Sequence, residues 1–213
     1  MAYIYKYLAG SKLFRIFAFG KLKTMITMDE QKKLENYLEL RIPVKKDPAW
    51  KDWSQQMRSA VKAAGIPVKW QWRFHYHMTI LYLDNNACVD QLTPGFAQCL
   101  SGISAFPITL DKLDAFTTGN GAEHIICLTT TQLPQQIRSL AQDTRTLADG
   151  LKAVYDHRPF KPHITLGRVS TEKATLEQLQ AALGTIEPPA FSCLLTEAEH
   201  RYRSGDCIKT WKL

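Results

Sequence analysis

The sequence has few cysteines, and none of them forms a Cys-x-x-Cys pair. The five cysteines are scattered and odd in number, which argues against a disulfide framework and against a zinc-ribbon site. No apolar run approaches the roughly 20 residues that a membrane-spanning helix needs, so we expect no transmembrane segment. This cysteine usage is typical of a reducing compartment, and we expect a cytoplasmic location.

The N-terminal apolar stretch also lacks the uninterrupted core of a signal peptide. Lys6, Lys12 and Arg15 break it. We predict a basic, poorly ordered extension over residues 1–33 and a single domain over residues 34–213. A basic amphipathic arm is one alternative, and a true start at Met25 or Met28 is another.

Acidic residues are outnumbered by basic ones. There are 27 lysines and arginines against 20 aspartates and glutamates, which gives a formal net charge of +7. Such a surface suits an anionic partner, of which nucleic acid is the usual one. Hydrophobic residues make up 45% of the chain, an ordinary globular composition, and we expect a monomer.

The chain divides into two halves of similar pattern. Each half has a strand, an amphipathic helix and then an apolar strand that carries a His-x-Thr sequence. The predicted strands lie at 37–44, 68–83, 106–116, 124–130 and around 163, the helices at 48–65, 92–100, from 134 and at 176–183, and a closing strand pair follows residue 190. Short turns between neighbouring strands favour an α+β fold with largely antiparallel sheets.

The first His-x-Thr sequence places His77 and Thr79 in the apolar stretch "HMTILYL". Side chains alternate across a strand, so residues i and i+2 share a face. His77 and Thr79 are therefore expected on one face, with Met78, Ile80 and Tyr82 on the other.

The second copy places His163 and Thr165 in "RPFKPHITLGRV". By the same alternation Ile164 and Leu166 face the core while His163 and Thr165 point together. One copy alone is a weak motif, because a single strand histidine is usually a packed or surface residue. Two copies, one in each half, are much harder to explain as packing.

Two imidazoles and two hydroxyls suit phosphoester cleavage without a metal or a cofactor. Near neutral pH one ring can act as a base while the other acts as an acid. The hydroxyls can hydrogen-bond the non-bridging phosphate oxygens. A metal pair of His75 and His77 is the alternative, but no further ligands stand at the spacing that zinc requires.

The segments "HMTI" and "RPFKPHITLGR" resemble the paired motif of the 2H phosphoesterase superfamily, in particular its branch of 2′-5′ RNA ligases, also described as RNA 2′,3′-cyclic phosphodiesterases. The resemblance implies a bilobal, pseudo-twofold α+β fold, with two mainly antiparallel sheets flanked by helices and a groove between the lobes. It implies His77 as the acid, His163 as the base, and Thr79 and Thr165 as phosphate-binding groups. Nothing in the sequence itself separates the two histidine roles.

Five residues near the motifs are candidates for substrate contacts. Tyr76 and Phe160 could stack on a base, although aromatic residues beside strands are usually core. Arg158, Lys161 and Arg168 could neutralise phosphates. Arg168 shares the parity of the inward residues and is expected at the strand end.

The leading hypothesis is therefore a phosphodiesterase acting on RNA 2′,3′-cyclic phosphate ends, with reversible 2′-5′ ligation as a related activity. The same site could act on 2′-5′-linked oligonucleotides or on small cyclic nucleotides. A non-catalytic RNA-binding module and a metallophosphoesterase are the rivals from other classes.

Overall fold

The structure is a computed structural model that describes residues 35–71, 76–83 and 89–213. In chain order its elements are β1 (Asn36–Ile42), a 3-10 turn (Val44–Lys46), α2 (Trp50–Ala63), β2 (Lys69–Trp70), β3 (Tyr76–Leu83), α3 (Val89–Leu100), β4 (Phe106–Leu110), β5 (Lys112–Thr117), β6 (Glu123–Thr129), α4 (Gln135–Gly150), β7 (Ile164–Ser170), α5 (Leu176–Leu183), β8 (Phe191–Leu195), β9 (Glu197–Tyr202) and β10 (Cys207–Lys212). The predicted extension over residues 1–33 lies outside the described residues. The division of the chain at residue 34 stays a prediction.

The strands form two antiparallel sheets. The larger one has the order β10–β9–β1–β3–β7–β6–β5, with β2 beside β7, and the smaller one pairs β4 with β8. The predicted α+β fold class is thereby confirmed. The stretch 106–116, expected as one strand, divides at Asp111 into β4 and β5, and the segment after residue 190 divides at Thr196 into β8 and β9.

The large sheet has a pseudo-twofold arrangement about its centre. The two motif strands, β3 and β7, are neighbours there, β1 and β6 flank them, and β9 and β5 lie outside these. The units β1–α2–β3 and β6–α4–β7 correspond to each other. In one half β4 and β5 precede β6 along the chain, whereas in the other their counterparts β8 and β9 come from the C-terminal end of the chain.

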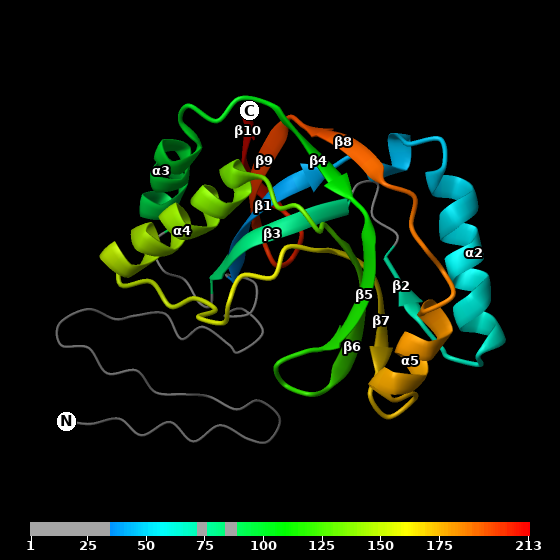
Figure 1. Cartoon of the computed structure of the whole chain (residues 1–213). Helices are drawn as coiled ribbons and strands as arrows, with labels where there is room; N and C mark the ends of the chain where they lie inside the picture. Colours follow the sequence, from blue (N-terminus) through cyan, green and yellow to red (C-terminus); the bar gives the residue numbers. More distant parts are fainter. Residues whose placement is uncertain (1–34, 72–75, 84–88) are drawn as a thin grey trace, which may run out of the picture.

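The helices cover the two halves of the sheet separately (Figure 1). Helices α3 and α4 lie together beside β1, β3 and β9, and α2 and α5 lie beside β2, β5 and β7. Helix α4, which precedes the second motif in sequence, thus contacts the strand that carries the first motif. Within the described ranges, no helix has the length and apolar character that a membrane crossing requires.

An aromatic cluster fixes α2 to the body of the protein. The rings of Trp50 and Trp53 lie 5.4 Å and 5.1 Å from that of Phe191 on β8, and Trp50 lies 5.1 Å from Tyr76 on β3. The indole nitrogen of Trp53 donates to the carbonyl of Glu187. Large buried aromatic side chains dominate the energetics of a core, so this cluster anchors the start of the first motif strand from behind.

Gly167 on β7 allows β2 to pack closely against the second motif strand, which leads to a first prediction. A Cβ atom at Gly167 would lie 2.6 Å from Val68 Cγ1 and 2.9 Å from Trp70 Cε3. We expect Gly167→Ala to lower the free energy of unfolding by about 1–3 kcal/mol, the usual cost of overpacking, measured by urea denaturation.

Gly150→Ala is the matched control, because a Cβ at Gly150 would meet nothing within 4 Å. Its unfolding midpoint should stay at or slightly above that of the wild type. Equal midpoints for the Gly167 variant and the wild type would contradict the packing argument.

Candidate active site

Strand pairing brings the two His-x-Thr sequences together at the centre of the sheet. Met78 on β3 pairs directly with Ile164 on β7, antiparallel, and both side chains are fully buried. The flanking motif residues are only half-buried, on the opposite face. Extending this register by one residue in each direction would set His77 opposite Thr165 and His163 opposite Thr79.

Both motif strands contain a β-bulge at the same place. The pairing of β1 with β3 skips Ile80, and the pairing of β6 with β7 skips Leu166. In each case the extra residue directly follows the motif threonine. A bulge bends the strand and increases its local twist, so each strand turns at the point where its motif ends.

The bulges correct two expectations from simple alternation. Tyr82 was expected opposite His77, but it pairs with Tyr37, and the two rings stack 6.2 Å apart. Tyr37 also lies 6.0 Å from the His77 ring, so Tyr82 is on the motif face. Arg168 likewise returns to the face of Thr165 and is exposed there, because the extra residue reverses the alternation.

His163 is held through its Nδ1 atom. This nitrogen lies 2.7 Å from the carbonyl oxygen of Lys161, which can only accept, so Nδ1 carries the proton. The ring of Phe116 on β5 contacts the imidazole edge-on at 5.2 Å. Burial lowers the pKa of His163 below its ordinary value, although the hydrogen bond to the Lys161 carbonyl acts in the opposite direction. The neutral form of His163 is therefore favoured, and its proton lies on Nδ1.

His77 has a different environment. Its Nδ1 atom lies 3.6 Å from the Glu39 carboxylate on β1, and the Glu39 side chain is 0% exposed. His77 pairs across the strands with Arg41, and Thr79 pairs with Glu39. The first motif thus faces charged side chains of β1, whereas the second faces an aromatic ring and a backbone carbonyl.

The predicted cationic contacts differ in their distance from the motifs. Lys161 lies beside the second motif, with Nζ 3.8 Å from the centroid of the Phe116 ring and 3.4 Å from Asp114. Arg168 is on the motif face, paired with Glu123 at 3.1 Å. Arg158 is bound to Asp156 through its guanidinium and is largely exposed, with no contact to the four motif side chains among the described interactions.

Tyr76 and Phe160, the two predicted aromatic contacts, belong to the hydrophobic core or pack against it. Tyr76 is 2% exposed and lies on the face opposite His77, because it shares the parity of Met78. It packs against Trp50, so it does not reach the motif face. Phe160 is half-buried against the hydrophobic core.

Sequence reasoning missed three residues of the site. Glu39 and Tyr37 belong to the alternation of β1, where a glutamate inside an apolar strand was an available signal. Phe116 ends a predicted strand, but nothing local in the sequence places it against His163.

Two other histidines have structural partners. His124 lies 3.0 Å from both Thr117 Oγ1 and the carbonyl of Ala174. His200 contacts Thr93 Oγ1 and Asn36 Oδ1, and burial lowers its pKa to about 4. His75, the second histidine of the metal alternative, lies outside the described residues. The described part of the chain contains no group of three or more potential metal-ligating side chains.

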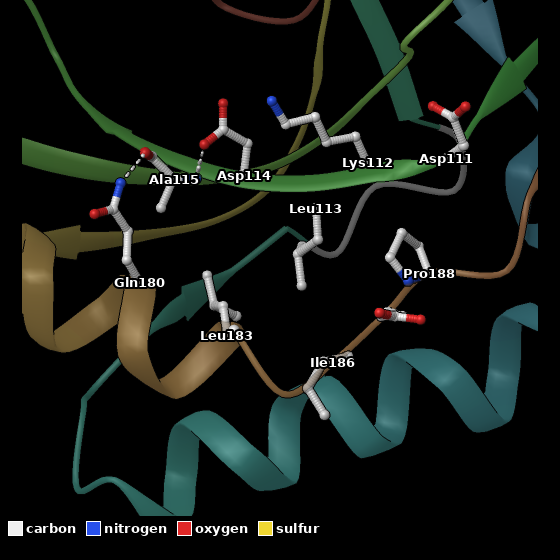
Figure 2. A pocket seen from close by; sticks show the side chains of 11 residues that line it. Asp111, Lys112, Leu113, Asp114, Ala115, Gln180, Leu183, Ile186 and Pro188 are labelled. Carbon is white, nitrogen blue, oxygen red and sulfur yellow. Dashed lines mark hydrogen bonds between the residues drawn. The ribbon is translucent and has the colours of Figure 1, made fainter.

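A surface cavity of about 320 Å³ lies away from the motifs, between β5, α5 and the segment that follows α5. Figure 2 shows Leu113 and Leu183 turned toward its interior, while Asp114 points to the other side of β5. Asp114 is the residue that pairs with Lys161. The cavity therefore lies behind the strand whose front faces the second motif.

Comparison with known proteins gives one family and several similar structures. A family model described as the 2′-5′ RNA ligase superfamily matches residues 84–206, a span that includes His163 and Thr165. E. coli LigT complexed with 3′-AMP aligns over 84% of this chain and 98% of its own, with a TM-score of 0.57 and 20% identity. Usb1 of Kluyveromyces marxianus aligns over 85% and 99%, with a TM-score of 0.61 and 10% identity. No curated protein sequence matches the chain. The similar structures share its fold.

The environment of His163 generates a second prediction. The ring should titrate at lower pH in the folded protein than in urea, measured by NMR, because burial disfavours its charged form. A folded pKa below the unfolded value of about 6.5 means that the unfolded state binds more protons. The free energy of unfolding should therefore fall as pH drops below about 6.5.

His200 contributes a pH dependence of the same sign, so the His163 part must be isolated. His163→Gln removes the contribution of His163. The measured quantity is the difference in free energy of unfolding between the variant and the wild type across pH 4–7. Identical midpoints in folded and unfolded chains would contradict the prediction.

Proposed function

Because this chain belongs to the 2′-5′ RNA ligase superfamily, we propose that it is a metal-independent phosphodiesterase that opens RNA 2′,3′-cyclic phosphate ends. The observation that supports this is the convergence of both His-x-Thr sequences on one face across the Met78–Ile164 pair. Two titratable rings and two hydroxyls then share one face of the sheet, where one phosphate could contact all four.

The environments of the two histidines support a division of roles. His163 has Nδ1–H fixed on the Lys161 carbonyl, and its neutral Nε2 accepts a proton from water. The water oxygen attacks phosphorus, and the bond from phosphorus to the 3′ oxygen breaks. His77 donates its proton to that oxygen, which leaves a 3′ hydroxyl and a 2′-phosphate. Exchange with solvent returns both rings to their starting states.

Thr79 and Thr165 serve as hydrogen-bond donors to the non-bridging oxygens. They are half-buried on the rigid centre of the sheet, so the phosphate is positioned without reorganisation of the protein. If a 5′ hydroxyl attacks in place of water, the same bond breaks and a 2′-5′ linkage forms. Ligation therefore needs no additional catalytic group.

Basic residues at the edge of the motif face support an RNA substrate. Lys69 on β2 pairs with Arg168 on β7, and Lys161 lies beside the second motif. Lysine and arginine contacts to the backbone supply affinity without sequence preference. The alternative substrates, 2′-5′-linked oligonucleotides and small cyclic nucleotides, use the same chemistry and fewer of these contacts.

Removing either histidine tests the proposal. His77→Ala and His163→Ala should each reduce turnover of a short RNA ending in a 2′,3′-cyclic phosphate by at least about 100-fold, the usual scale for one general acid or base. Excess chelator should leave wild-type turnover unchanged, and the product should end in a 2′-phosphate. Thr79→Val and Thr165→Val should also be impaired, because they lose the donors to the phosphate.

Thr109→Val is the matched control, since Thr109 lies on β4 outside the motif strands. Its turnover should equal that of the wild type, and unfolding curves should show that the histidine variants are folded. Loss of activity in chelator would favour the metallophosphoesterase. RNA binding without cleavage across pH 5–8 would favour a binding module.

A further inference from the structure

The two halves of the site differ at several equivalent positions, and one of these pairs lies beside the motif threonines. On β1, Glu39 pairs with Thr79, and on β6, Cys127 pairs with Thr165. Each of these residues is therefore the cross-strand neighbour of a motif threonine, directly beside the bulge. Both are fully buried. The pseudo-twofold relation places a carboxylate in one half where the other half has a thiol.

The thiol carries no charge near neutral pH. Burial raises the pKa of Cys127 to about 12, and the carboxylate of Asp114 raises it as well. The second motif thus has a neutral neighbour, and the Nδ1 atom of His163 uses a backbone carbonyl instead. The hydrogen bond to the Lys161 carbonyl and the charge of Asp114 favour a protonated His163, but burial outweighs them and lowers its pKa.

The carboxylate of Glu39 belongs to a network of charged side chains that includes Arg41 on the same strand and Glu199, its cross-strand partner on β9. An isolated buried carboxylate would be strongly destabilising. Arg41 contacts Glu197 at 2.5 Å and Glu199 at 3.4 Å, and Arg201 contacts Glu199 at 2.5 Å. Burial opposes the charge of Arg201, but Glu199 and Glu39 outweigh it and raise the pKa of the guanidinium. Glu39 is thus in electrostatic contact with Arg201 as well as with His77.

We propose that Glu39 is the positioning residue that makes His77 the proton donor. Its carboxylate lies 3.6 Å from Nδ1, so its negative charge favours the imidazolium, whose Nε2–H can then serve the leaving oxygen. The inference rests on the proposed function. It assigns the acid and base roles to the two histidines from the residue that lies beside each motif. The pseudo-twofold arrangement of the backbone does not by itself distinguish the two histidines. The difference arises because Glu39 in one half occupies the position that Cys127 occupies in the other.

Several charged or titratable groups besides Glu39 face His77 and must stay constant in a test. They are Tyr37 and Arg41 on β1, Glu199 and Arg201 on β9, Tyr82 on β3 and His163 on β7. Glu39→Gln removes the charge with little change of shape. Glu199→Gln is the matched control, because Glu199 is a buried carboxylate of the same network, one strand further from His77.

The experiment combines an NMR titration of the histidines with the pH dependence of kcat/KM on the cyclic-phosphate RNA. In Glu39→Gln the titration midpoint of His77 should fall by about one pH unit, the scale of one nearby opposite charge. The pH at which kcat/KM falls on the alkaline side should decrease by the same amount, because His77 stops donating protons once it is deprotonated. Turnover at pH 8 should fall by about tenfold and less at pH 5.5. Glu39→Asp, which retains the charge, should keep the alkaline limb close to that of the wild type.

The inference would be overturned if Glu39→Gln left the His77 titration midpoint and the alkaline limb of the kcat/KM profile unchanged. Equal shifts of both quantities in Glu199→Gln would also overturn it. A purely structural role would lower turnover evenly at all pH values and leave both quantities in place, which also overturns it. The NMR arm needs no substrate. A wild-type protein that does not cleave the RNA would therefore count against the proposed function, while the titration still decides the role of Glu39.

Discussion

The cross-strand pair of Met78 and Ile164 joins the two halves of the large sheet. Both side chains are fully buried, so their strands present the intervening histidines and threonines on the other face. The apolar character of these two positions is therefore as important to the site as its polar residues. A shift of register by one residue would turn each motif into the core.

The backbone around this pair shapes the site further. Each motif strand bulges directly after its threonine, which brings Arg168 and Tyr82 onto the motif face. The result is a symmetric frame with unequal surroundings, with the Phe116 ring near His163 and the buried Glu39 carboxylate near His77. Duplication supplies two similar histidines, and their neighbours on adjacent strands give them different chemistry.

Period-two alternation in the sequence was sufficient to predict the shared faces of His77 with Thr79 and of His163 with Thr165, as well as the α+β class. It could not place Arg168 or Tyr82, because a bulge depends on pairing with a distant strand and not on local pattern. Tyr76 illustrates the opposite case, since strict alternation with His77 already favoured a core position. Phe116 reaches His163 only through tertiary pairing, which single-sequence reasoning does not see.

The two halves also differ in how the chain completes them. Strands β4 to β7 follow one another within residues 106–170, whereas β1 needs β9, at residues 197–202, as its outer neighbour. Pairing between distant segments carries a larger loop-closure cost and forms more slowly than local pairing. During synthesis β5, β6 and β7 can pair within contiguous chain, while β1, which carries Glu39, waits for β9. The strands around His77 are thus the part of the sheet whose pairing is completed last.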